Sequence, residues 1–307
     1  MALLDTTFGA RFCAGVLFAS LACCSSLRAE HTLTPTPSIA AMNPKEDQLI
    51  RKIGLDTLPP GSPRRGVVAV WSDEFASSLV QAAGVEGATL LAETALPNEL
   101  GEASRKWSWS TPNSPGARVH LQVFVSSAGP EIARRRLVML TTENQLMDVP
   151  YDRGPADLGD ASAIFSVLPS FAHVVWAFHN VCIALEVSDA PGVDALAVAR
   201  AAQRFLARHV VAPLDPAIPR VQRVELSAAA VRVNETLTMR IHLEGAEPQR
   251  RFLVALHDRP LDVGVRRAGL DFDVFAQYPG EKTLTLLIAD AGTLLSTSAQ
   301  VRIIINL

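Results

Sequence analysis

The strongest constraint on the fold is a series of short alternating runs in the C-terminal part of the chain. Alternation of apolar and polar residues predicts β-strands with one buried face. Turn residues separate the runs, notably at 245–248 and 278–280. We therefore expect residues 213–307 to form a compact antiparallel β-sandwich. The runs lie at Val221–Leu226, Leu237–Leu243, Phe252–Leu256, Leu270–Phe275, Thr283–Ile288 and Ala299–Ile305.

Three segments of this region resemble bacterial immunoglobulin-like modules. They are Val231–Leu237, the turn Tyr278–Gly280 that leads into Thr283–Leu286, and the terminal run Val301–Ile305. The resemblance is confined to the C-terminal region, and the cysteine pair of the family is absent from it. Such modules usually act as spacers, presenters or binding surfaces, so the resemblance implies a role of that kind.

Residues 66–212 show a different pattern, in which strands are mixed with helices. The run Val119–Val125 alternates aliphatic with other residues, which predicts a strand. A helix is expected to begin at Gly129-Pro130, with Arg134–Arg136 mostly outside its inward stripe, and another to run from near Pro191 to about Arg208. We expect an α+β domain with a small sheet covered on one face.

The N-terminal residues have the layout of a secretory leader. Arg11 precedes the apolar run Phe12–Cys24, and small residues follow to Ala29. We expect residues 1–29 to be a cleaved signal peptide and residues 30–65 to be a flexible spacer with an irregular arm. Two alternatives stay open, an uncleaved anchor and a lipoprotein in which Cys23 carries the lipid. We expect an extracytoplasmic chain, in the periplasm or at the cell surface, and in the lipoprotein alternative the lipid would anchor it there.

Charge and cysteine content exclude several classes of protein. A formal charge of -3 and a pI near 6.2 argue against nucleic-acid binding, which favours a strongly basic domain. After ordinary cleavage only Cys182 would remain, so the fold cannot contain an internal disulfide or a cysteine-rich zinc site. A single thiol in an apolar strand is expected to be buried.

Four residues are candidates for ligand binding. Trp107 and Trp109 flank one residue of an expected strand, so their rings would share a side and either stack on a sugar or cover the edge of a core. Asp157 and Asp160 frame Gly159 in a tight loop. Their carboxylates could gather a cation, or cap the turn by accepting from backbone amides, which is the more common use.

Two histidines and a basic stripe complete the candidates. His173 and His179 would lie about 20 Å apart on one straight strand, too far apart for a shared metal. Arg200, Arg204 and Arg208 repeat along the last helix of the α+β region and are expected to be a solvated face, although anionic lipid is an alternative.

The sequence contains no serine-hydrolase elbow, phosphate loop or zinc-protease motif. We therefore expect an exported, non-catalytic envelope protein with no cofactor, no metal and no nucleic-acid partner. Its α+β domain would bind an envelope protein or a glycan, and a membrane would be contacted only through the lipid. The alternatives are a secreted enzyme with a dispersed site near Asp157, Asp160, His173 and His179, and a purely structural spacer.

Overall fold

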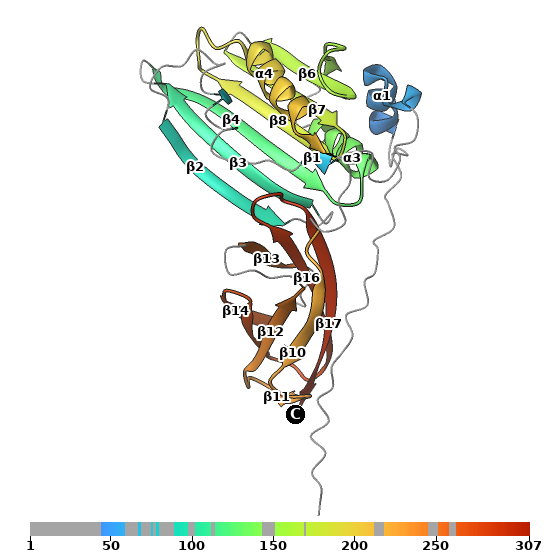
Figure 1. Cartoon of the computed structure of the whole chain (residues 1–307), viewed down its shortest axis with the longest axis vertical. Helices are drawn as coiled ribbons and strands as arrows, with labels where there is room; N and C mark the ends of the chain where they lie inside the picture. The colour runs from blue at the N-terminus through green and yellow to red at the C-terminus, as the bar shows by residue number, and fades with distance from the viewer. Residues whose placement is uncertain are drawn as a thin grey trace, which may run out of the picture.

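The computed structural model is dominated by antiparallel sheets, with few helices, and the chain is α+β and mostly β (Figure 1). The structure describes residues 44–58, 67–68, 75, 78–79, 89–97, 102–111, 114–142, 151–168, 170–211, 218–244, 251–257 and 262–307. The expected signal peptide, including Cys23, and most of the expected spacer lie outside these residues.

A seven-stranded antiparallel sheet forms the N-terminal half of the fold, in the order β2-β3-β4-β8-β7-β6-β5. A helix follows two of its inner strands, α3 (Pro130–Thr142) after β4 and α4 (Ala195–Arg208) after β8. The short strands β1 (Val67–Val68) and β9 (Val210–Val211) pair with each other. The seven strands are β2 (Thr89–Pro97), β3 (Glu102–Thr111), β4 (Ser114–Ser126), β5 (Asp152–Arg153), β6 (Ala161–Leu168), β7 (Phe171–Phe178) and β8 (Val181–Ser188).

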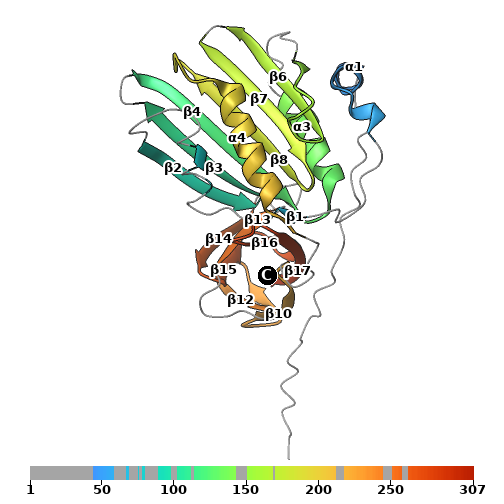
Figure 2. The ribbon, with the colours of Figure 1, turned by 45° about the horizontal axis from the view of Figure 1, so that its top comes forward.

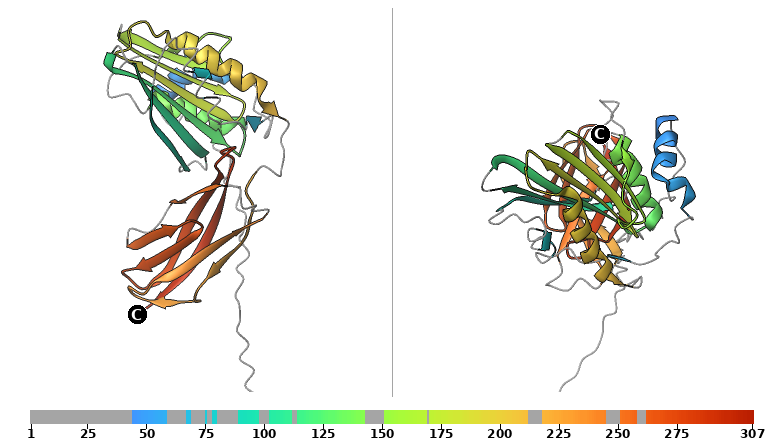
Figure 3. Two further views of the ribbon diagram at one scale, coloured as in Figure 1. Left: turned by 60° about the vertical axis from the view of Figure 1, so that its left-hand side comes forward. Right: turned by 90° about the horizontal axis from the view of Figure 1, so that it is seen from above.

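Helices cover both faces of this sheet, so the expectation of one covered face was wrong (Figures 2 and 3). Trp176 and Ile183 belong to the core beneath α4, whereas Val175 and Cys182 belong to the core beneath α3. Side chains alternate along a strand, and β7 and β8 are apolar at successive positions, so each strand supplies both cores. We call these the α4-side core and the α3-side core. The burial of Cys182 confirms the expectation for that thiol.

The three arginines of α3 are buried, which contradicts their expected place outside the apolar stripe. Helix α1 (Pro44–Ile53), which leads into the short 3-10 helix η1 (Leu55–Thr57), packs on α3 and supplies the partner of Arg135. Each guanidinium has a carboxylate partner, because a buried charge must be compensated. The pairs are Arg134 Nη1 with Glu131 Oε1 at 3.0 Å, Arg135 Nη1 with Glu46 Oε2 at 3.2 Å, and Arg136 Nε with Glu102 Oε2 at 2.8 Å.

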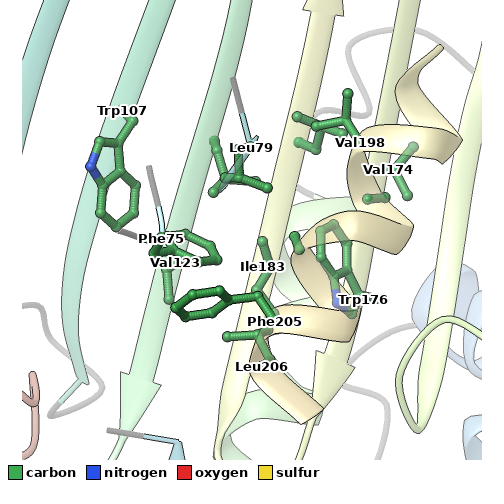
Figure 4. Close-up of a cluster of buried hydrophobic side chains, with 14 of the residues drawn as sticks. Phe75, Leu79, Trp107, Val123, Val174, Trp176, Ile183, Val198, Phe205 and Leu206 are labelled. Atoms are coloured by element: carbon green, nitrogen blue, oxygen red, sulfur yellow. The ribbon is translucent and has the colours of Figure 1, made fainter. Parts of the chain in front are cut away.

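Helix α4 covers the other face with a regular amphipathic stripe. Its N-cap is Asp194, whose carboxylate accepts from the amides of Leu196 and Ala197, as a capping residue should. Phe205 packs edge-on against Phe75, and the Trp176 Nε1–H donates to Gln203 Oε1 at 3.1 Å. These contacts close the α4-side core (Figure 4).

The C-terminal half contains two four-stranded sheets, β10-β12-β15-β14 and β11-β17-β16-β13, whose buried residues form one shared core. Each run predicted from alternation is a strand, and β11 and β14 were not predicted. The arrangement is compatible with a β-sandwich. The strands are β10 (Val221–Leu226), β11 (Val231–Arg232), β12 (Leu237–Leu243), β13 (Phe252–His257), β14 (Val263–Ala268), β15 (Asp271–Ala276), β16 (Gly280–Asp290) and β17 (Ser296–Asn306).

The turn between β16 and β17 reaches into the N-terminal half. Leu294 and Leu295 are 0% and 1% exposed and belong to the α4-side core rather than to the core of their own sheets. The amide of Ser296 donates to Ser127 Oγ at 2.6 Å, and β13 and β16 contact β2. We call this contact the joint between the two halves (Figure 1).

Candidate functional site

Polar side chains collect on the α3 side of β3, β4 and β8. The opposite side of the same strands carries the buried Trp107, Leu121 and Leu185 of the α4-side core. Alternation therefore directs the intervening residues to the other side. We call this set the polar face. It consists of Ser104, Lys106, Ser108, Arg118, His120, Gln122, Glu186 and Ser188.

One row of the polar face runs straight across neighbouring strands. Ser108 of β3 pairs in register with His120 of β4, His120 with Glu186 of β8, and Glu186 with His173 of β7. Ser108 Oγ lies 2.6 Å from Nδ1 of His120, which is a short hydrogen bond. Because neighbouring strands are about 4.8 Å apart, the row places a hydroxyl, an imidazole and a carboxylate side by side.

The far end of the row is aromatic. Tyr151 Oη lies 2.6 Å from Nδ1 of the buried His173, and the rings of Phe165 and Phe171 meet edge to face with centroids 5.5 Å apart. Tyr151 also packs against Phe165. Both phenylalanines are half-buried, so the cluster forms an apolar border to the polar face.

Both imidazoles are held in the neutral form near neutral pH. Burial lowers the pKa of His173 to about 4, because the charged ring is poorly solvated there. Burial also lowers the pKa of His120, assisted by the ammonium of Lys106 and opposed by the carboxylate of Glu186. When a hydroxyl donates to Nδ1 of a neutral ring, the ring proton stays on Nε2, which then acts as a donor.

Ser108 lies inside β3, which pairs with β2 on one side and with β4 on the other, so the row is held in register by the sheet. The arrangement offers fixed donors and acceptors, which suits binding.

The two tryptophans proposed from sequence are core side chains. Trp107 and Trp109 are 2% and 6% exposed and share the α4-side core, where Trp107 packs edge-on against Phe75. Their rings do share one side of β3, as the spacing predicts. That side faces inward, so neither ring presents its face to solvent.

The two aspartates of the loop act within the fold. Asp157 Oδ2 accepts from Arg200 Nε at 2.9 Å, and this hydrogen bond lowers the pKa of Asp157. Asp160 Oδ2 accepts from the amide of His179 at 3.0 Å, at the turn between β7 and β8. Gly159 has φ 68°, a conformation that favours glycine. The loop therefore ties α4 and the turn together.

The side chains of the enzyme alternative do not converge. Asp160 meets the backbone of His179 at one end of β7, whereas His173 lies near the other end beside Tyr151, and Asp157 is bound to α4. In the described parts of the chain no three histidine, cysteine, aspartate or glutamate side chains gather as a metal site would require. The described helices are all too short or too polar to cross a membrane.

Sequence reasoning missed the residues of the row other than His173. The polar alternation of His120 and Gln122 along one strand was visible, and Ser108 comes from the preceding strand, but Glu186 comes from a strand far away in the sequence. Only the sheet order brings them together. Searches against protein-family models and against curated proteins return no match for this chain.

Proposed function

We propose that this chain is an exported, non-catalytic binding protein of the cell envelope. Residues 213–307 would be an immunoglobulin-like module that positions the α+β domain of residues 66–212, and the polar face would contact an envelope protein or glycan. The leader-type N-terminus supports export, and the resemblance of the C-terminal region to immunoglobulin-like modules supports a presenting role.

The observation that carries the proposal is the joint. Leu294 and Leu295 insert into the α4-side core, and Arg105 Nη2 donates to the carbonyl oxygen of Ala291 at 3.2 Å. A module joined through buried side chains holds its neighbour in one orientation, unlike a domain on a flexible linker. A module that presents a binding domain is expected to hold that domain in a fixed orientation relative to itself.

Co-sedimentation of the purified chain with isolated bacterial envelopes tests this function. We expect the chain without residues 1–29 to sediment with the envelopes, and Glu186→Gln to weaken that binding. Arg204→Gln lies on the exposed side of α4 and is expected to leave binding unchanged. Absence of binding, or turnover of an envelope substrate by the purified chain, would overturn the proposal.

Export has a separate test in the intact mass of the chain from membrane and soluble envelope fractions. A mature chain beginning at Glu30 indicates ordinary cleavage, and a lipid-modified chain beginning at Cys23 indicates a lipoprotein. Recovery of the unprocessed chain in the cytoplasm would contradict export.

A further inference from the structure

We propose that the polar face binds a neutral oligosaccharide, with Glu186 and His120 at the centre of the site. The inference rests on the proposed function and specifies its ligand class. It starts from the chemical mixture of the polar face, which contains serine hydroxyls, an amide, an imidazole, a carboxylate and two basic groups. Sugar hydroxyls both donate and accept hydrogen bonds, so a polyol can satisfy such a mixture.

The central row alternates in hydrogen-bonding character. Glu186 accepts only, and it stands in register between His120 on one strand and His173 on the other. Nδ1 of His120 lies 2.6 Å from the Ser108 hydroxyl, and when that hydroxyl donates to Nδ1 the other ring nitrogen is a donor. Adjacent hydroxyls on one sugar ring would match an acceptor and a donor held on neighbouring strands about 4.8 Å apart.

The orientation of these groups is fixed before a ligand arrives. Ser108 is 6% exposed and its hydroxyl holds the His120 ring, while that ring stays neutral because burial and Lys106 lower its pKa. A preorganised set of groups avoids much of the entropic cost of ordering side chains on binding.

The aromatic border provides the apolar half of the site. Phe171 pairs in register with Ser188, and Phe165 pairs with His173, so both rings adjoin the polar rows. The two half-buried rings meet at 5.5 Å and are held by Tyr151. Sugar rings have apolar C–H faces that pack on aromatic rings, and their hydroxyls lie around the edge.

In the row from Ser108 to His173, Glu186 is the one charged side chain, so this row favours a neutral ligand group over an acidic one. Lys106 and Arg118 lie in the neighbouring rows, one on each side of it. A uronic acid or phosphate at the centre would meet this negative charge in a partly desolvated place, which is unfavourable. Neutral hydroxyls would instead donate to it.

Titration calorimetry with defined tetra- to hexasaccharides tests the inference, using the chain without residues 1–29. The neutral probes are oligomers of glucose, mannose, galactose and N-acetylglucosamine, and the acidic probe is an oligogalacturonide. We expect at least one neutral probe to bind and Glu186→Gln to weaken it at least tenfold. Glu244→Gln makes the same chemical change at an exposed position of the C-terminal sheets and is expected to have no effect.

Phe171→Leu keeps the apolar volume but removes the ring, and we expect it to weaken binding about tenfold while the thermal midpoint changes little. Preference for the acidic probe, or equal affinity of Glu186→Gln and the unaltered chain, would overturn the inference. Envelope binding that depends on Glu186 with no oligosaccharide bound would refute the glycan while leaving the proposed function standing. Absence of both kinds of binding would refute both.

Discussion

The joint leads to a specific prediction at Leu294, a residue whose buried side chain stabilises the fold although its backbone conformation is strained. Its φ of 56° lies in the left-handed region, which a leucine rarely adopts, while its side chain is 0% exposed in the α4-side core. Three neighbours hold the conformation, because Asp290 Oδ1 accepts from the amides of Gly292 and Thr293, and the amide of Leu294 donates to the carbonyl oxygen of Asp290 at 2.8 Å. Burial of the Leu294 side chain therefore raises the free energy of unfolding, whereas its left-handed backbone conformation lowers it.

Leu294→Ala and Leu294→Gly separate the two effects. Both remove a buried leucine side chain, which costs about 2–5 kcal/mol of unfolding free energy in a core that cannot collapse fully. Only glycine also removes the left-handed strain, which is worth about 1–2 kcal/mol for an L-residue. We therefore expect Leu294→Gly to be about 1 kcal/mol more stable than Leu294→Ala, the reverse of the usual order in regular structure.

Scanning calorimetry and urea unfolding of the chain without residues 1–29 measure this difference. A loss of about 3 kcal/mol would lower the midpoint by about 6–12 °C for a fold of this size. Ile304→Ala, at a side chain 50% exposed on β17, is the control and should change stability little. If the glycine variant proves equal to or less stable than the alanine variant, the argument from strain is refuted.

Three further predictions concern buried groups. Burial lowers the pKa of His173 to about 4, from an unfolded value near 6.5. The free energy of unfolding should therefore be highest above pH 6.5 and decline by up to about 3 kcal/mol as the pH falls to 4. Urea unfolding of His173→Gln across this range should lack this pH-dependent decline. Glu102→Gln should cost about 3–5 kcal/mol by leaving the guanidinium of Arg136 without its charge partner, whereas Glu102→Leu with Arg136→Met should recover most of the loss in the same assay. Gly159→Ala should lower the thermal midpoint, since φ is 68° and an added Cβ would meet the carbonyl of Ala177, and an unchanged midpoint would contradict this.

The strands of the C-terminal half could be predicted because their signal is local. Each residue pair such as Leu284 and Leu286 faces the shared core while the residues between them face outward, so the period of two is written directly in the sequence. β14 was missed because Val263–Ala268 combines a glycine with two adjacent arginines, which breaks the alternation. A Cβ at Gly264 would meet the ring of Phe275 on the paired strand, so a larger residue there would require that ring to move.

The two faces of the seven-stranded sheet could not be predicted in the same way. Strands such as β7 are apolar at successive positions, and an apolar run does not say how many layers cover it. The burial of Arg135 depends on Glu46, which lies on a helix far away in the sequence. Long-range pairs of this kind carry no periodic signal, and for the same reason the place of Glu186 beside His120 could not be predicted.

The alternation of side chains along β3 and β4 places the core residues on one side of the sheet and the residues proposed to bind the ligand on the other. Trp107 and Leu121 belong to the α4-side core, together with Leu295 of the joint. Their chain neighbours Ser108 and His120 lie on the polar face. Since the two sets of side chains project from opposite sides of the same strands, a change on the polar face leaves the joint in contact. Glu186→Gln should therefore weaken ligand binding at an unchanged thermal midpoint, and Leu294→Ala should lower the midpoint while the folded fraction keeps its affinity. A variant of the polar face that loosened the joint would show that the two faces are coupled through the strands.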